Sequence, residues 1–259
     1  MIVKPDGLRY WLTFYAQRLF MLPALWLVFR VLNRVEVEGV EHLAELEGRS
    51  VILCPNHRTA WDSWVGTVWA LSSRRRLVAR DSYMGVLAAP ENVPTVPLRI
   101  LTSILGAIPV DRQQGVDQHA LQDTARIMQD PRRKVVLTVF PEGTRSRTGR
   151  MRRRGRPGIG WLQHKTGAPV VPIYHSGGEG MPGIGLKLKI RIGKPLYLEA
   201  HREAPDELST WRAITADVMR ALHAMEDEAR AEGDVRPPRR GPPRWRGRTR
   251  RASSRVPSA

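Results

Sequence analysis

Hydrophobic and polar residues follow two alternating patterns from about residue 34 onward. Short apolar runs of strand length alternate with stretches in which apolar residues recur every three or four positions. The predicted helices lie near 62–71, 116–129, 157–166 and 207–230. The predicted strands are Arg34–Val37, Ser50–Leu53, Leu77–Ala79, Ala107–Val110, Lys134–Phe140, Val170–Tyr174 and Lys187–Ile192. This alternation predicts an α/β domain in which helices cover a mixed central sheet.

The first 34 residues have a different pattern. Eleven uncharged residues, LFMLPALWLVF, lie between Arg18 and Arg30 and follow an aromatic-rich stretch. A bilayer span needs about 20 apolar residues, so we expect this run to be too short to cross. Apolar residues flanked by arginine favour two short amphipathic helices, broken near Pro23, in the membrane interface. The alternative is an ordinary helical hairpin packed on the core.

The charge of the chain is strongly positive, at +17 for 259 residues. Such a charge favours a polyanionic partner, which could be nucleic acid, an acidic membrane surface or a phosphorylated substrate. Residues 233–259 contain nine arginines and one aspartate among proline, glycine and serine. We predict a basic disordered tail there, because the segment has too little apolar surface to fold. The predicted organisation is therefore a membrane-associating segment over 1–34, a globular domain over 35–232 and the tail.

The cysteine and histidine content limits the chemistry. A single cysteine, Cys54, excludes an internal disulfide and a cysteine-based metal cluster, and fits a reducing compartment. It could end a buried strand as a small apolar residue, or act as a thiol beside His57. The seven histidines lack a metal-binding spacing. We therefore expect no metal and no cofactor.

The stretch CPNHRTAWD, residues 54–62, places a histidine and an aspartate five positions apart. Such positions point about 140° apart on a straight helix, so the pair can meet only across a turn. Pro55 ends the preceding strand, which predicts His57 on a loop and Asp62 in the first turn of a helix. Asp62 could then accept a hydrogen bond from one imidazole nitrogen and leave the other as a base. A chance pair is the competing interpretation.

Three further segments follow predicted strands: GAIPVDR at 106–112, FPEGTRS at 140–146 and VVPIYHS at 170–176. Ligands of α/β sheets bind beyond the strand ends, so these segments could converge on His57. Arg112 and Arg145 suit a phosphate monoester, because a guanidinium donates paired hydrogen bonds. For each arginine the alternative is a surface salt bridge.

Taken in this order, the four segments resemble the lysophospholipid acyltransferase family, which includes the 1-acyl-glycerol-3-phosphate acyltransferases. NHRTAWD is similar to the family's N-H-x4-D motif, and GAIPVDR, FPEGTRS and VVPI are similar to its second, third and fourth motifs. The resemblance runs from about Val35 to Pro195. It implies a glycerol-phosphate acyltransferase-like fold and identifies 35–232 as an acyltransferase domain.

The resemblance also implies roles for individual residues. His57 would be the general base and Asp62 its orienting partner. Arg156 stands where family members often carry a lysine. The residues implied to bind the acceptor and its phosphate are Arg112, Glu142, Gly143, Arg145 and Arg156. Pro172 would lie in the acyl or acceptor pocket.

The function that follows is acyl transfer from acyl-CoA or acyl carrier protein to the free hydroxyl of 1-acyl-glycerol-3-phosphate. A base, a fixed acceptor hydroxyl and donors for the oxyanion suffice, so no enzyme nucleophile is needed. Accordingly, Ser63, Ser146 and Ser176 lack a G-x-S-x-G elbow. We expect the enzyme at the cytoplasmic face of the membrane, attracted by anionic lipid.

Several alternatives remain open from the sequence. The acceptor could be another lysolipid, such as lyso-ornithine lipid or a lysophospholipid with a head group. A thioesterase would share the base but use water. A nucleic-acid-binding protein would explain the charge, but the tail has one aromatic residue, Trp245, where base stacking would need several. Nucleic acid is therefore not an expected partner.

Overall fold

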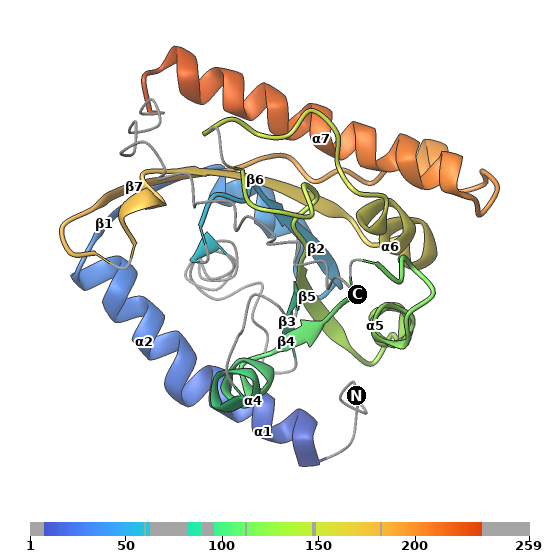
Figure 1. The fold of residues 1–259 in the computed structure, drawn as a ribbon, viewed down its shortest axis with the longest axis horizontal. Helices are drawn as coiled ribbons and strands as arrows, with labels where there is room; N and C mark the ends of the chain where they lie inside the picture. The colour runs from blue at the N-terminus through green and yellow to red at the C-terminus, as the bar shows by residue number, and fades with distance from the viewer. Residues whose placement is uncertain are drawn as a thin grey trace, which may run out of the picture.

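A computed structural model of the chain describes residues 8–59, 61–62, 82–89, 96–111, 113–146, 149–181 and 183–234. These residues contain a seven-stranded sheet with the order β1-β7-β6-β2-β5-β3-β4. Its strands are β1 (Arg34–Glu38), β2 (Val51–Pro55), β3 (Ser82–Ala88), β4 (Ala107–Pro109), β5 (Lys134–Thr138), β6 (Val170–Ser176) and β7 (Lys187–Ile192). Helices lie on both sides of the sheet (Figure 1). The predicted mixed α/β fold is confirmed.

Strand direction divides the sheet into two parts. Five neighbouring strands, β6, β2, β5, β3 and β4, run parallel to one another. β7 is antiparallel to β6, and β1 is parallel to β7. The carboxyl ends of the five parallel strands therefore share one edge of the sheet, where ligands of such sheets bind.

The buried strands place alternate side chains on opposite faces. In β2, Ile52 and Cys54 join one core cluster, whereas Val51 and Leu53 join the other. This division follows from the two-residue repeat of a strand, and it explains why a strand with both faces covered is continuously apolar.

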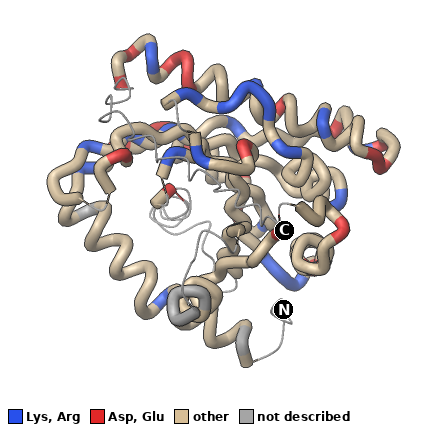
Figure 2. The backbone as a smooth tube through the Cα atoms, viewed as in Figure 1, with Lys and Arg blue, Asp and Glu red and all other residues tan. Residues whose placement is uncertain are grey.

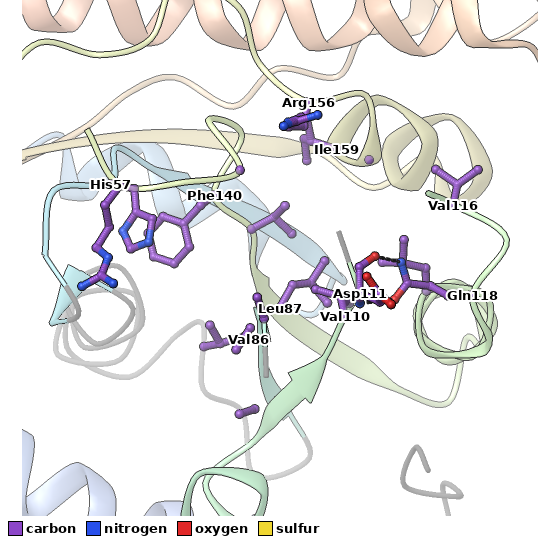
Figure 3. Close-up of a pocket in the computed structure, with 18 of the residues that line it drawn as sticks. His57, Val86, Leu87, Val110, Asp111, Val116, Gln118, Phe140, Arg156 and Ile159 are labelled. Carbon is purple, nitrogen blue, oxygen red and sulfur yellow. Dashed lines mark hydrogen bonds between the residues drawn. The ribbon is translucent and has the colours of Figure 1, made fainter. Parts of the chain in front are cut away.

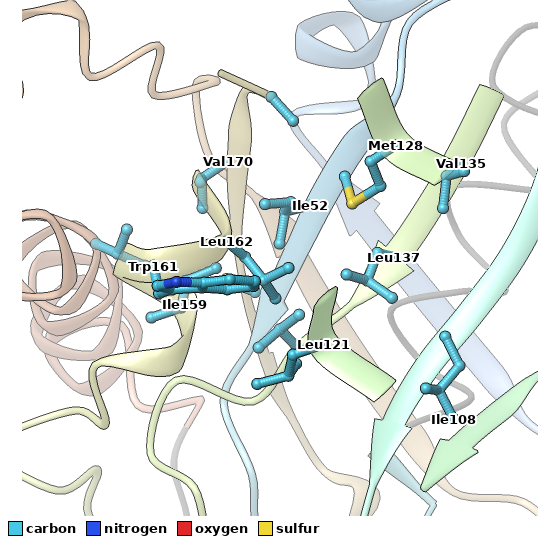
Figure 4. Packing of buried hydrophobic residues seen from close by; sticks show 14 of the residues in the cluster. Ile52, Ile108, Leu121, Met128, Val135, Leu137, Ile159, Trp161, Leu162 and Val170 are labelled. Carbon is cyan, nitrogen blue, oxygen red and sulfur yellow. The ribbon is translucent and has the colours of Figure 1, made fainter. Parts of the chain in front are cut away.

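Three helices cover the first face: α5 (His119–Gln129), α6 (Gly158–Thr166) and α7 (Leu208–Ala231). Trp161 and Leu162 of α6 and Leu121 of α5 pack against Ile52 and Leu137 of the sheet (Figure 4). All three helices were predicted from the spacing of apolar residues. Short 3-10 turns, η3 (Val40–Leu46), η5 (Gly178–Gly180) and η6 (Glu199–His201), complete the connections.

The N-terminal segment forms one continuous helix across the second face, in which α1 (Leu8–Ala16) and α2 (Leu22–Trp26) alternate with π-helical turns η1 (Gln17–Met21) and η2 (Leu27–Val31). The prediction of two helices broken near Pro23 is wrong. Pro23 lies in the first turn of α2, directly after a π-helical turn, where the helix tolerates a missing backbone N–H. The expectation that the apolar run is too short to cross a bilayer is also wrong. By length and composition, the helix over Tyr10–Phe29 is long and apolar enough to span one.

This helix is nevertheless packed on the protein along one side. Met21, Leu25 and Phe29 are buried in the second core cluster with strand residues. The amide of Gln17, which is fully buried, donates from Nε2 to the carbonyl of Met84 over 2.7 Å. The inner face is therefore part of the folded domain.

Two elements near the sheet edge were not predicted. One is β3, which carries Gly85 at its centre, and glycine weakens a strand pattern. A Cβ atom on Gly85 would lie 3.1 Å from Ile108 Cδ1 and 3.2 Å from Leu137 Cδ1, so close packing explains the glycine. The other is α4 (Val96–Ile104), which lies against α1. The predicted strand Leu77–Ala79 and the predicted helix beyond Asp62 lie outside the described residues.

Asp234, which the prediction placed in the tail, contacts the folded domain. The Asp234 carboxylate accepts hydrogen bonds from Arg191 Nη2 over 2.6 Å and pairs with Lys189 Nζ over 3.1 Å. These contacts join the end of α7 to β7. Residues 235–259, which hold all nine arginines of the tail, lie outside the described residues.

Candidate active site

The polar residues of the predicted motifs gather at the shared edge of the parallel strands. His57 follows β2, Glu142 follows β5, and His175 lies at the end of β6. The three chain segments contact one another directly, because His57 N–H donates to Glu142 and Asn56 bonds to His175. Two of the three predicted segments, FPEGTRS and VVPIYHS, thus contact the His57 turn, and Ala107, Val110 and Asp111 of GAIPVDR line the same cavity as His57.

His57 and Asp62 meet across a tight turn, as their spacing requires. Nδ1 of His57 lies 3.1 Å from Oδ2 of Asp62. The imidazole also stacks on the Phe140 ring, with centroids 3.9 Å apart. His57 Nε2 has no partner among the residues that the structure describes, and the side chain lines a cavity. The stacked ring and the Nδ1 contact together fix the direction of Nε2.

The Asp62 carboxylate is buried yet ionised. Oδ2 accepts hydrogen bonds from the backbone N–H groups of Arg58 and Thr59, and Oδ1 accepts one from Thr59 Oγ1 over 2.7 Å. Burial alone would raise the pKa of Asp62, but the charge of His175 and the hydrogen bonds from His57 and Thr59 outweigh it and lower the pKa to about 2. An ionised Asp62 makes His57 Nδ1 the donor and leaves Nε2 with the free lone pair.

The backbone of His57 is held on both sides by the FPEGTRS segment. His57 N–H donates to Glu142 Oε1 over 2.9 Å, and Ser146 N–H donates to the His57 carbonyl over 2.8 Å. Glu142 Oε2 accepts from the backbone N–H of Arg152 over 2.9 Å. Both oxygens of this buried side chain therefore accept hydrogen bonds from backbone N–H groups. Burial raises the pKa of Glu142. Glu142 was expected to bind the acceptor, but it is buried and is not among the residues that line the cavity, and its contacts position the backbone of His57 instead.

A cavity of about 590 Å³ extends from His57 along the sheet edge (Figure 3). Its polar mouth is formed by His57, Gly143, Arg145 and Arg156. The remainder is largely apolar, with Asp111 and Gln118 as polar exceptions. It is lined by residues of β3, β4, α4, α5 and α6 and of the loops beside them, including Val86, Leu87, Leu105, Val110, Val116, Leu121 and Ile159. A polar mouth and a long apolar body suit a ligand with a charged head and a hydrocarbon chain.

Two of the predicted phosphate-binding arginines lie at this mouth. The side chains of Arg145 and Arg156 are exposed, and neither guanidinium has a hydrogen-bond or ion-pair partner among the described residues. Gly143, two residues before Arg145, turns the chain with φ +68°, and a Cβ atom there would lie 2.5 Å from Arg156 Cγ. Glycine is therefore required both by the backbone and by the packed arginine.

The other predicted residues are placed differently. Pro172 is buried within β6, opposite Cys54, and is not among the residues that line the cavity. Arg112 lies outside the described residues. In its loop, Gln118 donates from Nε2 to the carbonyls of Asp111 and Gly115 over 2.9 and 2.6 Å, which shapes the inner wall of the cavity.

The sequence interpretation missed a buried group behind the pair. Arg58 lies under the His57 turn and bonds to Tyr174 Oη over 2.7 Å and Glu179 Oε1 over 2.6 Å. His175, on the far side of Asp62, was also not assigned, although it closes the segment VVPIYHS. An apolar strand that ends in histidine was the available signal.

Other chemistry receives no support from the described residues. Cys54 is fully buried in β2, and burial raises the pKa of its thiol far above the ordinary range, so a thiolate nucleophile is disfavoured. Within the described ranges, no group of three or more histidine, cysteine or acidic side chains is arranged to hold a metal ion.

Known proteins place the chain among acyltransferases. A model of the acyltransferase family matches residues 34–176, which is more than half of the chain. The 1-acyl-sn-glycerol-3-phosphate acyltransferase of Pseudomonas aeruginosa is 28% identical over 220 residues, covering 81% of this chain and 74% of the relative. The chloroplastic 1-acyl-sn-glycerol-3-phosphate acyltransferase BAT2 of Brassica napus is 26% identical over 172 residues, covering 63% of this chain and 45% of the relative.

A solved structure has the same fold. The crystal structure of the 1-acyl-sn-glycerophosphate acyltransferase PlsC from Thermotoga maritima aligns with a TM-score of 0.53 and 20% sequence identity, covering 87% of this chain and 85% of that chain. The matched family region contains His57, Asp62 and the FPEGTRS segment. By its sequence and its fold, the chain belongs to the acyltransferase family and is an acyltransferase enzyme.

Proposed function

We propose that this acyltransferase moves a fatty acyl chain from acyl-CoA or acyl carrier protein to the free hydroxyl of 1-acyl-glycerol-3-phosphate, giving phosphatidic acid. The observation that carries the proposal is the cavity, which joins a basic mouth at His57 to an apolar body. The names of the bacterial and plant relatives support this acceptor.

The reaction needs one proton to move twice. His57 Nε2 removes the proton from the acceptor hydroxyl while the hydroxyl oxygen attacks the thioester carbonyl. The tetrahedral intermediate then collapses, the C–S bond breaks, and the imidazolium returns the proton to the leaving thiolate. Asp62 stabilises the imidazolium between these steps, because it stays ionised. No group of the enzyme becomes acylated in these steps, and the steps need no cofactor.

The acceptor phosphate is assigned to the mouth of the cavity. Arg145 and Arg156 present two guanidinium groups there that have no partner in the described part of the chain, and the first residues of α6, Gly158 and Ile159, line the same cavity. Guanidinium groups bind phosphate oxygens in pairs, and the N-terminus of a helix favours an anion. Four neighbouring arginines, Arg150, Arg152, Arg153 and Arg154, are also exposed and add positive potential around the mouth.

Replacing Arg145 or Arg156 with alanine should raise the apparent KM for 1-acyl-glycerol-3-phosphate by about 10-fold or more, because a charge-assisted hydrogen bond contributes about 1.5–3 kcal/mol. The KM for the acyl donor should change little. The matched control is Arg126→Ala, since Arg126 is exposed on α5 and pairs only with Asp123 among the described residues. Equal weakening toward both substrates would contradict the assignment.

The acceptor can be identified by competition among lysolipids. Purified enzyme would receive one acyl donor and an equimolar mixture of 1-acyl-glycerol-3-phosphate, lysophospholipids with head groups and lyso-ornithine lipid, with products resolved by mass. The proposal predicts that phosphatidic acid dominates the products. Preference for a lysolipid without a terminal phosphate would overturn it.

We also propose that the enzyme docks on the membrane through the outer face of its N-terminal helix. Leu12, Leu19, Phe20, Trp26 and Leu27 are exposed there although the opposite side of the helix is buried. Figure 2 shows this helix almost without charge, whereas α7 carries many charged residues. An exposed apolar face beside aromatic residues suits the membrane interface, and a helix packed along its inner face would lie on a bilayer.

We include α4 in the proposed docking face. Ile100, Leu101 and Ile104 are exposed on α4, which contacts α1, while Thr102 and Leu105 of the same region line the cavity. The apolar part of the cavity therefore lies next to the proposed membrane surface. We further propose that the enzyme attaches to the cytoplasmic face of the membrane.

Replacing Phe20 and Trp26 together with serine should weaken binding to phospholipid vesicles by about 10-fold or more, because each fully buried large apolar side chain contributes about 1.5–3 kcal/mol. Point substitutions are preferable to deletion of residues 1–33, which would expose the second core cluster. Leu208→Ser is the matched control, since Leu208 is an exposed apolar residue at the start of α7, which covers the other face of the sheet. Unchanged vesicle sedimentation of the double variant would show that the membrane anchor lies elsewhere.

A further inference from the structure

His175 faces the catalytic carboxylate from the side opposite to the cavity. Its Nε2 lies 3.6 Å from Oδ1 of Asp62, while His57 contacts Oδ2 of the same carboxylate. The His175 side chain is 2% exposed, so bulk water does not separate the two groups. Asp62 is thus shared by two imidazoles, of which only His57 reaches the cavity.

The same nitrogen also holds the backbone of the motif. His175 Nε2 lies 3.0 Å from the carbonyl oxygen of Asn56, the residue directly before His57. A carbonyl oxygen can only accept a hydrogen bond, so Nε2 carries a proton and donates it. The direction of this N–H is therefore fixed by the main chain of the His57 turn.

The Asn56 side chain forms two hydrogen bonds with the backbone of His175. Its Oδ1 accepts from the His175 backbone N–H over 2.8 Å, and its Nδ2 donates to the His175 carbonyl over 3.1 Å. Together with the Nε2 bond, three hydrogen bonds clamp the turn after β2 to the end of β6. Both residues are buried, so each broken bond would leave a polar atom without water.

We propose that His175 is a positioning residue, which fixes the Asn56–His57 turn so that His57 Nε2 points into the cavity. The role rests on the proposed function of His57 as the base. It extends the active site to the end of β6, beyond the N-H-x4-D segment itself. Small displacements of a catalytic group can cost about 10²-fold in rate, so this clamp should act on turnover rather than on substrate binding.

The test compares two substitutions that differ in one donor. His175→Gln places an amide N–H close to the position of Nε2, whereas His175→Leu keeps a similar volume without a donor. We expect the leucine variant to lose about 10- to 100-fold in kcat, with the KM values for acceptor and donor within about twofold of wild type. The glutamine variant should recover at least half of that loss on a logarithmic scale.

Melting temperatures and a distant histidine serve as controls. His201, which pairs with Asp217 on the surface, should tolerate asparagine with unchanged kcat. If the leucine variant does not fold, His175→Asn takes its place, because its shorter amide does not reach the Asn56 carbonyl. Wild-type kcat in a folded donor-free variant, or glutamine and leucine variants of equal kcat, would overturn the proposal.

Failure of this proposal is separable from failure of the proposed function. All variants are assayed with the acceptor that wild-type enzyme uses best, whichever lysolipid that is. An acceptor other than 1-acyl-glycerol-3-phosphate would therefore change the substrate assignment, and the ratio of the two variants would still decide the role of His175.

Discussion

Replacing His57 with alanine should lower kcat by about 10²- to 10⁴-fold, the usual contribution of a general base, without a change in fold. The expectation rests on an Nε2 at the cavity that no described residue contacts, and on an Nδ1 held 3.1 Å from an ionised carboxylate. Because the loss lies in chemistry, kcat and kcat/KM should fall together. Steady-state release of thiol, measured with acceptor present, gives both quantities.

His119 supplies the matched control for this substitution. It is an exposed histidine at the start of α5 and does not line the cavity. His119→Ala should therefore transfer acyl groups at the wild-type rate. A His57→Ala enzyme with similar turnover to this control would remove His57 from the reaction.

Replacing Asp62 with asparagine should lower kcat by about 10²- to 10⁴-fold as well, for a different reason. An amide can donate to Nδ1 and so favour the tautomer whose proton sits on Nε2, where the lone pair is needed. The NH₂ group would also face backbone N–H groups of Arg58 and Thr59 that now donate to the carboxylate. Turnover should fall without a comparable rise in the KM of either substrate.

Replacing Asp62 with asparagine should also change how the free energy of unfolding depends on pH. The pKa of Asp62 is lowered to about 2 in the folded protein, below its ordinary value of 3.8. Its contribution to stability is therefore complete above about pH 4 and is lost as the pH falls toward 2. Chemical denaturation at pH 7 and pH 3 should show a smaller pH difference for Asp62→Asn than for wild type. An identical pH difference would contradict a low pKa for Asp62.

The sheet was largely predictable because its strands are buried on both faces. A continuous apolar run that ends at polar residues, such as Val170–Tyr174, predicts a buried strand. β3 was not predicted because it contains Gly85, which weakens the strand pattern. The glycine is explained by close packing against Ile108 and Leu137, and neither residue is near it in sequence. The continuous N-terminal helix escaped because a π-helical turn before Pro23 keeps the chain helical across a residue that usually ends a helix.

The contacts of the candidate site were predictable where both partners lie in the same short segment of the chain. His57 and Asp62 are five residues apart, so the turn between them could be inferred from spacing. Glu142 was expected to bind the acceptor, because its partners are backbone N–H groups 85 and 10 residues away, which sequence patterns do not record. His175 contacts Asn56 across 119 residues, and only the parallel pairing of β2 with β6 brings them together.

The most direct test of the central claim is a single-turnover reaction of the enzyme with labelled acyl donor and 1-acyl-glycerol-3-phosphate, followed by mass analysis. The account predicts one phosphatidic acid formed for each thiol released, no labelled protein, and almost no product with His57→Ala. Thiol released as free fatty acid without phosphatidic acid, or label that remains on the protein as an intermediate, would contradict direct transfer to this acceptor.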